Sequence, residues 1–144
     1  MNTLHKLCVP GLLAVVAVCS AAQETKTQIK REAAPVTSAA SGSEMYASYC
    51  ASCHGKDAMG NGPAAPALKS VPPNLTTLAK RNGGKYPALR VRSILLGKEN
   101  LVPHGDQEMP VWGPVFRTIS AGHEEIVDLR IDNLNRYLES LQAK

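Results

Sequence analysis

The chain has 144 residues, a formal net charge of +4 at pH 7, an apolar fraction of 44% and an aromatic fraction of only 4%. Behind an N-terminal segment of non-globular composition, that length leaves room for one domain of about 100 residues and excludes a second of ordinary size. Because the chain has only one Phe and one Trp, we expect something besides side chains, such as a cofactor, to complete the core.

Residues 1–22 have the pattern of an export signal peptide. Lys6 precedes an apolar run from Leu7 to Cys19, and small residues follow that run. The run is shorter than the roughly 18 to 20 residues that a membrane-spanning helix needs, and Pro10 interrupts it. An uncleaved signal anchor is the alternative interpretation. We therefore expect a bacterial exported protein, either free in the periplasm or attached to the outer face of the inner membrane or to the outer membrane.

Two maturation routes are open at the end of this signal. Cleavage after Ala22 removes the first two of the four cysteines, whereas the letters VAVC, ending at Cys19, resemble a bacterial lipobox whose cysteine is lipidated. Val18 stands where lipoproteins usually carry Gly, Ala or Ser. Under either route the mature domain keeps only Cys50 and Cys53, in a compartment where unprotected thiols oxidise.

Residues 23–43 are polar and rich in Ala, Ser and Thr, without a sustained apolar period. Such a segment cannot bury enough surface to offset the entropy of ordering, so we interpret it as a flexible linker. With a lipidated N-terminus, this linker would tether the domain to a membrane. The folded domain is then expected to span residues 44–144.

Four helices are predicted, in chain order. The first has Ser43 as its N-cap and runs through EMYASYC; the second lies in NLTTLAKRNGG, closed by Gly83 and Gly84. The third lies in PALRVRSILLG, with Pro87 at its first position, and the fourth runs from about His123 to Leu141. The apolar face of the fourth is predicted to hold Ile126, Leu129, Leu134, Tyr137, Leu138 and Leu141. No segment shows clean alternation, so the sequence predicts an all-α domain with long loops.

The run CASCH, residues 50–54, carries the most specific chemistry. A Cys-x-x-Cys pair can form a redox disulfide, half of a zinc site or the attachment point of a haem. In c-type attachment Cys50 and Cys53 form thioethers with the haem vinyl groups, and His54 becomes the proximal iron ligand. A thioredoxin-like site lacks its βαβ surroundings, and a zinc site lacks a second ligand pair because His104 and His123 are isolated. The motif therefore favours a covalent haem, with the other two sites as alternatives.

From Ser43 to Leu141 the chain resembles the single-haem class I bacterial cytochromes c. The resemblance rests on the ordered stretches MYASYCASCHG, GNGPAAPAL, EMPVWG and NRYLESL. It implies an all-α class I cytochrome c fold, with short helices and long loops wrapped around one covalent haem c and its iron. It also implies an electron carrier rather than an enzyme, and we expect a monomer that works with redox protein partners.

The resemblance implies that a methionine sulfur from a downstream loop fills the sixth iron position. Met109, in EMPVWG, has the required reach. Met45 lies on the first helix, and Met59 follows His54 by only five residues, too few to pass around the haem edge. The rival ligand is His104, in the same loop as Met109, which would give a bis-histidine site of lower potential.

Two further residues are implied near the haem. Pro63 matches the family proline whose carbonyl accepts the ring N–H of His54, with Pro66 as the alternative. Trp112 is expected to pack beside the haem and to donate its indole N–H to a propionate; a plain core aromatic is the alternative.

No motif of catalytic residues appears, so the sequence favours electron transfer without catalysis. The alternatives are a cytochrome subunit of a periplasmic dehydrogenase or oxidase, or a peroxidase-type haem with a labile Met109. Between Ala58 and Lys98, a range that we call the basic segment, there is no Asp or Glu. Its cations predict a partner with an acidic docking face rather than nucleic acid, with a merely solvated surface as the alternative; they are Lys69, Lys80, Arg81, Lys85, Arg90, Arg92 and Lys98.

Overall fold

The structure is a computed structural model that describes residues 34–99 and 109–143. The export signal, the first part of the linker and His104 lie outside the described residues. Within the described ranges every regular element is a helix, which confirms the all-α prediction. No helix in this part of the chain is long and apolar enough to cross a membrane.

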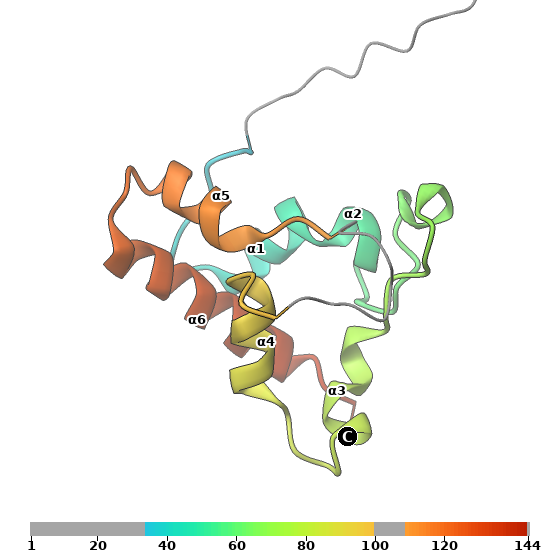
Figure 1. The fold of residues 1–144 in the computed structure, drawn as a ribbon. Helices are drawn as coiled ribbons and strands as arrows, with labels where there is room; N and C mark the ends of the chain where they lie inside the picture. Colours follow the sequence, from blue (N-terminus) through green and yellow to red (C-terminus); the bar gives the residue numbers. More distant parts are fainter. Residues whose placement is uncertain (1–33, 100–108, 144) are drawn as a thin grey trace, which may run out of the picture. The chain divides into compact units, whose positions relative to one another are not determined.

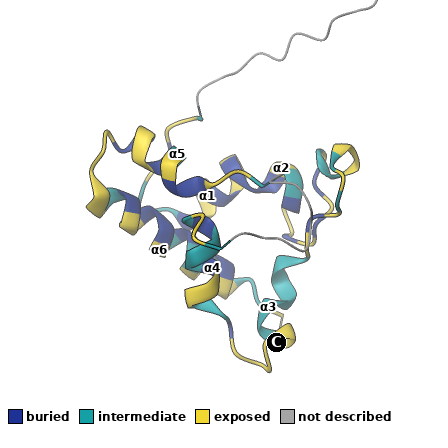
Figure 2. Cartoon of the chain, viewed as in Figure 1, coloured by how far each residue is buried: buried dark blue, intermediate teal, exposed yellow. Residues whose placement is uncertain are grey.

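Six α-helices and two short 3-10 helices (η) follow one another along the described residues (Figure 1). They are α1 (Gly42–Tyr49), α2 (Ala51–His54), η1 (Ala65–Ala67), η2 (Leu75–Thr77), α3 (Leu78–Arg81), α4 (Ala88–Leu95), α5 (Trp112–Ile119) and α6 (Glu124–Ser140). The long C-terminal helix α6 packs against α1, α4 and α5. Buried residues of α1, α5 and α6, coloured dark blue in Figure 2, form the centre of the core.

The crossing of α1 and α6 depends on small and aromatic residues. A Cβ atom on Gly42 would lie 2.2 Å from the carbonyl oxygen of Asn133, so only glycine permits this approach of the two backbones. One turn further along, the rings of Tyr46 and Tyr137 are 5.5 Å apart and tilted by 50°. Their aromatic contact therefore extends the crossing that Gly42 allows.

The buried face of α6 agrees with the predicted one in its second half. Leu134 and Leu138 are buried as predicted, and Tyr137 and Leu141 are partly buried against the core. In the first half the buried apolar residues are Val127 and Ile131, whereas the predicted Leu129 is 40% exposed. Apolar residues follow two overlapping helical stripes in this sequence, and the prediction took the first half of the face from the wrong stripe. The contacts with α1 and α5 select the stripe that starts at Val127.

The domain begins before residue 44. The N-cap of α1 is Ser41, whose hydroxyl accepts a hydrogen bond from the Glu44 amide at 3.2 Å, so the prediction of Ser43 was two residues late. Thr37 is buried, and the side chain of Asn133 donates to the carbonyl of Ala39 at 2.9 Å. The last part of the expected linker is therefore packed against α6.

The helix α5 was not predicted. Its sequence, WGPVFRTI, has Gly113 and Pro114 in the first turn. These two residues conceal the helical period, although proline is tolerated in the first turn of a helix. The segment buries Trp112 and Phe116. The predicted helices in 74–84 and 87–97 are present as η2 with α3 and as α4, and Pro87 is the N-cap residue of α4 rather than its first residue.

Candidate functional site

The short helix α2 places both cysteines and the histidine of CASCH within one turn. Cys50 ends α1 and begins α2, and its carbonyl accepts from the amides of Cys53 at 3.1 Å and His54 at 2.9 Å. Cys50 is buried, Cys53 is partly exposed, and both thiols are free. Two thioether anchors and an imidazole can therefore meet one rigid macrocycle.

The loop after α2 folds back over the carbonyl end of this helix. Gly60 donates to His54 at 2.8 Å, Gly62 to Cys53 at 3.1 Å and Ala64 to Ser52 at 2.8 Å, all through backbone atoms. A Cβ atom on Gly62 would lie 2.3 Å from the carbonyl oxygen of Ser52, so glycine is needed for this close approach. These bonds fix the motif against its own loop.

The acceptor beside His54 is Pro73, which corrects the prediction of Pro63. Nδ1 of His54 lies 3.2 Å from the carbonyl oxygen of Pro73. Pro63 stands between Gly62 and Ala64, whose amides bond the back of α2, so its carbonyl belongs to a different part of the loop. Pro72 and Pro73 line the same cavity as His54, whereas Pro63 does not. Pro66 is also not among the residues that line the cavity described below.

The environment of His54 suits a metal ligand. Burial lowers the pKa of this imidazole, and the hydrogen bond to Pro73 opposes that shift only in part. The neutral ring with its proton on Nδ1 donates to the Pro73 carbonyl and leaves the lone pair of Nε2 free. Such a contact fixes both the tautomer and the ring orientation of a histidine ligand.

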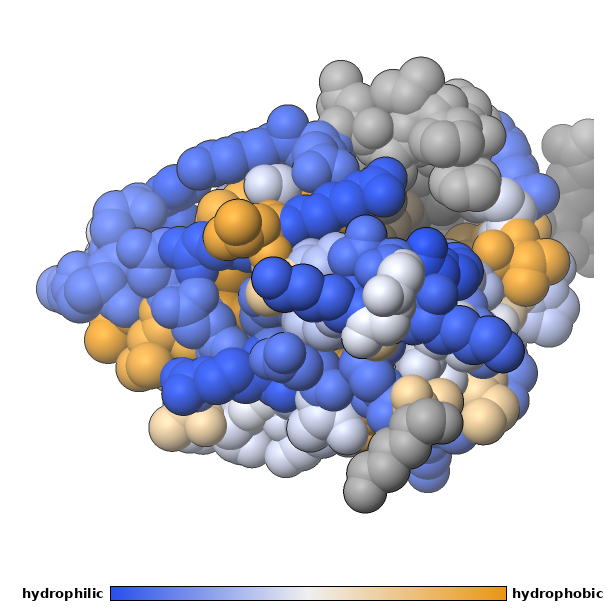
Figure 3. Space-filling view, turned by 90° about the horizontal axis from the view of Figure 1, so that it is seen from below, coloured by the Kyte–Doolittle hydropathy of each residue, from blue (hydrophilic) through white to orange (hydrophobic). Residues whose placement is uncertain are grey.

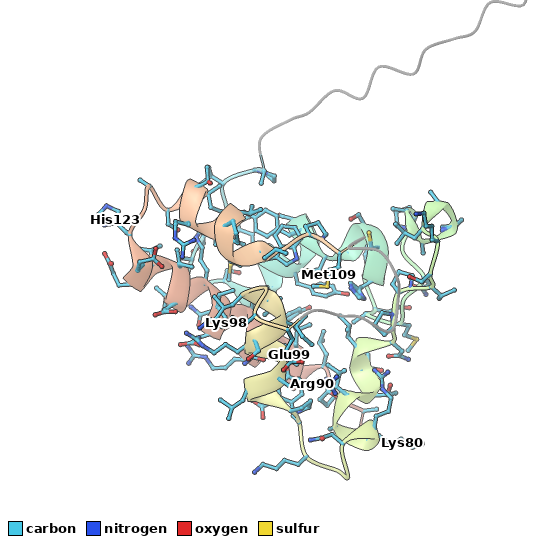
Figure 4. The ribbon with its side chains drawn as sticks, viewed as in Figure 1. Lys80, Arg90, Lys98, Glu99, Met109 and His123 are labelled. Carbon is cyan, nitrogen blue, oxygen red and sulfur yellow. The ribbon has the colours of Figure 1, made fainter. Side chains whose placement is uncertain are left out.

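A cavity of about 250 Å³ adjoins the motif. Its lining includes Cys50, Cys53 and His54 of the motif, Met109 from the segment before α5, and Trp112, the first residue of α5. The remaining lining is mostly apolar and includes Leu68, Val71, Pro72, Leu75, Leu78, Val91, Ile94, Leu95 and Leu138. Figure 4 shows the sulfur of Met109 pointing from its segment toward the interior of the domain.

The other described methionines are placed elsewhere. Met45 is fully buried in the core, where its sulfur lies 3.9 Å from the guanidinium of Arg130. Met59 is 56% exposed and does not line the cavity. His123 is exposed beside Glu125 at the N-terminal end of α6, and this end of the helix points away from Met109 (Figure 4). Among the residues that the structure describes, Met109 alone brings a methionine sulfur to the cavity.

An aromatic cluster forms one wall of the cavity. Trp112 is 8% exposed, and its ring centroid lies 5.3 Å from that of Tyr49 and 5.9 Å from that of Phe116. The structure places Trp112 in the lining of the cavity, packed against Tyr49 and Phe116. Its hydrogen bond to a haem propionate stays a prediction. Sequence reasoning missed Tyr49, although its position directly before Cys50 was a usable signal.

The donor set fits a haem better than a bare metal ion. Burial, with a further contribution from Cys53, raises the pKa of the Cys50 thiol to about 12, so this sulfur is neutral and sits in an apolar wall. No group of three or more His, Cys, Asp or Glu residues within 34–99 and 109–143 could hold a metal ion. A planar apolar macrocycle needs what the cavity supplies: two thiols, one neutral imidazole, a soft sulfur and apolar walls.

A scan against protein families matches residues 37–123 to the family described as cytochrome C oxidase, cbb3-type, subunit III. The match includes the CASCH motif, Met109 and Trp112. Comparisons with curated proteins and with solved structures gave no match. Because the family match covers more than half of the chain, and its motif lies at a cavity that suits the cofactor, the chain belongs to this family of single-haem class I cytochrome c domains, which bind haem c covalently.

Proposed function

We propose that this protein carries single electrons on a haem c ligated by His54 and Met109, and that it exchanges them with exported or membrane-bound redox proteins. The family itself implies haem-based electron transfer. The observation that supports the specific ligation is the cavity, where Met109 and the CASCH motif meet from distant parts of the sequence.

The roles of the residues follow from their surroundings. His54 and Met109 would hold the haem iron, which would supply one-electron redox chemistry, and the thioether sulfur of Met109 would favour its ferrous state. His54, held by the Pro73 carbonyl, keeps one orientation in both oxidation states. The apolar lining would limit water at the haem, and ligation by both His54 and Met109 would leave no position on the iron for oxygen or peroxide. Little has to move when an electron arrives or leaves.

Ligand substitution tests this proposal. Met109→Ala should give holoprotein that has lost the charge-transfer band of ferric iron bonded to methionine sulfur, has a lower potential and, when reduced, binds carbon monoxide. Met59→Ala is the matched control, since Met59 is exposed and away from the cavity, and it should behave as the wild type. Ready binding of carbon monoxide by the reduced wild type at neutral pH would contradict a closed sixth position.

The family description favours a second candidate, a cytochrome subunit within a larger redox enzyme. The matched family is named for a subunit of an oxidase, and a subunit would use the same haem site to pass electrons to its complex. Solubilisation in mild detergent followed by affinity purification distinguishes the two. Recovery of the chain alone supports the free carrier, and recovery with a catalytic protein in fixed ratio supports the subunit.

The charges of the basic segment suggest where a partner docks. Arg90 pairs with Glu99 at 3.2 Å, and Arg92 pairs with Asp128 at 2.6 Å and with Asp132, so these two cations are largely neutralised. Three exposed cations on or just after α3 have no carboxylate partner within the described ranges; they are Lys80, Arg81 and Lys85. We call them the α3 basic cluster. Figure 3, which looks onto this side of the domain, shows a mostly hydrophilic surface.

The α3 basic cluster is close in sequence to residues that line the cavity. Leu78, the first residue of α3, lines the cavity, and Val71, another lining residue, is 83% exposed. An acidic partner attracted to the cluster would therefore approach the exposed side of the haem. Electrostatic steering of this kind raises association rates by about 10-fold or more at low salt.

Charge reversal tests this docking face. Changing all three cations of the α3 basic cluster to glutamate should slow electron transfer to the native partner and flatten its dependence on ionic strength, with an unchanged haem spectrum. Arg136→Glu, on α6, reverses an exposed charge outside the basic segment and serves as the control. If the rate of electron transfer changes neither with ionic strength nor with the triple substitution, this face is excluded as the docking site.

A further inference from the structure

Arg130 is a buried cation in the middle of α6 that the haem site does not use directly. Its exposed fraction is 4%. The acidic residues near it along α6 pair elsewhere: Asp128 and Asp132 with Arg92, and Glu124 with Arg117. Within residues 34–99 and 109–143, no carboxylate lies at ion-pair distance from Arg130.

Among the described residues, the groups that hydrogen-bond to this charge are all neutral. Nε of Arg130 donates to the Ser120 hydroxyl at 3.1 Å, and one terminal nitrogen donates to the Thr37 hydroxyl at 3.1 Å. Ser120 is the C-cap residue of α5, so the negative end of that helix dipole compensates part of the charge. A buried ion without a counter-ion still costs free energy, and apolar residues of similar volume often replace buried ions without loss of stability. Packing alone therefore gives no reason for an arginine here.

A chain of hydrogen bonds connects Arg130 to a residue of the haem cavity, and the donor of each bond in it can be assigned. An arginine can only donate, so the Thr37 oxygen accepts from it. The Tyr49 hydroxyl donates to the Pro35 carbonyl at 2.5 Å, so its single proton is committed there. Thr37 must then donate to the Tyr49 oxygen, 2.8 Å away. The chain of donors runs from Arg130 through Thr37 and Tyr49 to Pro35.

Tyr49 connects this chain to the cofactor site. It lines the cavity, directly precedes Cys50, and packs against both Trp112 and Phe116, with ring centroids 5.3 Å and 5.6 Å away. Because its hydroxyl makes two hydrogen bonds and its ring contacts two aromatic neighbours, it has one orientation at the cavity wall.

We propose that Arg130 is a positioning residue for the haem: it holds Tyr49 in the cavity wall through Thr37, and its buried charge, which has no counter-ion among the described residues, stabilises the reduced state and so raises the reduction potential. This inference rests on the electron-transfer role proposed above, but not on the identity of the sixth iron ligand. A unit charge at an effective dielectric constant of about 20 and a separation on the order of 12 to 25 Å changes a one-electron equilibrium by roughly 3- to 10-fold.

Two pairs of substitutions in the holoprotein separate charge from shape. Arg130→Gln keeps hydrogen-bond donors and removes the charge, whereas Arg130→Lys keeps the charge. At a fixed applied potential, Arg130→Gln should lower the ratio of reduced to oxidised protein by about 3- to 10-fold. At ~59 mV per tenfold change, this is a fall of about 30 to 60 mV. Arg130→Lys should stay within about twofold of the wild type.

The second pair works even if Arg130→Gln does not fold. Thr37→Asp places a carboxylate beside Arg130 and still accepts from it, although it cannot donate to the Tyr49 oxygen as Thr37 does. It should lower the potential by about as much as Arg130→Gln. Thr37→Asn has the same shape without the charge and should leave the potential near the wild-type value. In each variant the ferric charge-transfer band should persist, which shows that the iron ligands are unchanged and separates this test from that of Met109.

Equal potentials in Thr37→Asp and Thr37→Asn would overturn the proposal, because the charge would then have no effect on the haem. Equal shifts in Arg130→Gln and Arg130→Lys would also overturn it, because they would assign the effect to shape alone. A lower potential in Thr37→Asp than in Thr37→Asn, with unchanged iron ligands, supports it.

Discussion

Gln142, just beyond α6, joins the C-terminal end of this helix to the segment that forms part of the cavity. Its side-chain oxygen accepts from the Ala79 amide at 2.9 Å, and its side-chain nitrogen donates to the carbonyls of Leu75 and Leu138, each at 2.8 Å. Both leucines line the cavity. Gln142→Ala removes all three hydrogen bonds and should loosen η2 and α3 from α6.

The structure sets the size of this effect. A hydrogen bond between neutral groups contributes about 0.5 to 1.5 kcal/mol net, so three give an upper range of about 1.5 to 4.5 kcal/mol. Gln142 is only partly buried, and water can replace some of these bonds, so we expect a loss of about 2 kcal/mol in the free energy of unfolding. Because Leu75 and Leu138 would then be held less firmly in the cavity lining, the haem should also become more accessible to small ligands.

The assay is guanidinium denaturation of ferric holoprotein, followed by far-ultraviolet circular dichroism. Glu139→Ala, an exposed substitution on α6, is the control and should change stability by less than about 0.5 kcal/mol. Gln142→Glu gives a sharper comparison, since its carboxylate can accept from Ala79 but faces the carbonyls of Leu75 and Leu138.

At neutral pH, Gln142→Glu should be at least as destabilised as Gln142→Ala. Those carbonyls favour the protonated acid and raise its folded-state pKa above the unfolded value of about 4.3. The raised pKa means that stability recovers as the pH falls and is lost as the pH rises through the folded-state pKa. A loss below about 0.5 kcal/mol for Gln142→Ala, or full stability of Gln142→Glu at neutral pH, would refute this reasoning.

Three further predictions concern the motif and the N-terminus. Tyr46→Phe should cost about 0.5 to 1.5 kcal/mol in denaturation experiments, because it removes the hydrogen bond that the buried Tyr46 hydroxyl donates to the Gly55 carbonyl at 2.7 Å and leaves that oxygen with the Ala58 amide alone, 3.2 Å away; a change within error would contradict it. Gly62→Ala should sharply reduce the yield of holoprotein, measured as haem per protein, because its Cβ atom would lie 2.3 Å from the Ser52 carbonyl oxygen, and normal haem content would refute the clash. Cys19→Ala should release the protein from the membrane fraction if the lipobox is used, and unchanged fractionation would favour ordinary signal cleavage.

The sequence predicted the parts of the site that depend on short-range chemistry. The spacing of Cys50, Cys53 and His54 is set by the geometry of one macrocycle, so a local pattern was enough to identify the haem motif. Met109 could be selected by reach along the chain, and the structure brings it to the same cavity as the motif. Its bond to iron stays a prediction.

Features that depend on tertiary contacts could not be predicted. The carbonyl beside His54 comes from Pro73 because backbone bonds from Gly62 and Ala64 hold the intervening loop behind α2, and no local signal distinguishes one loop proline from another. Thr37 lies in a stretch with the composition of a linker, and only its contacts with Tyr49 and Arg130 show that it is part of the domain.

The most direct test of the ligation is the proton spectrum of reduced holoprotein labelled at its methionine methyl groups. A methyl group directly above the iron lies in the ring current of the porphyrin and resonates far from the others. We predict one such signal, which disappears in Met109→Leu and remains in Met59→Leu. The absence of a displaced methyl signal in the wild type, or its persistence in Met109→Leu, would contradict a haem held between His54 and Met109.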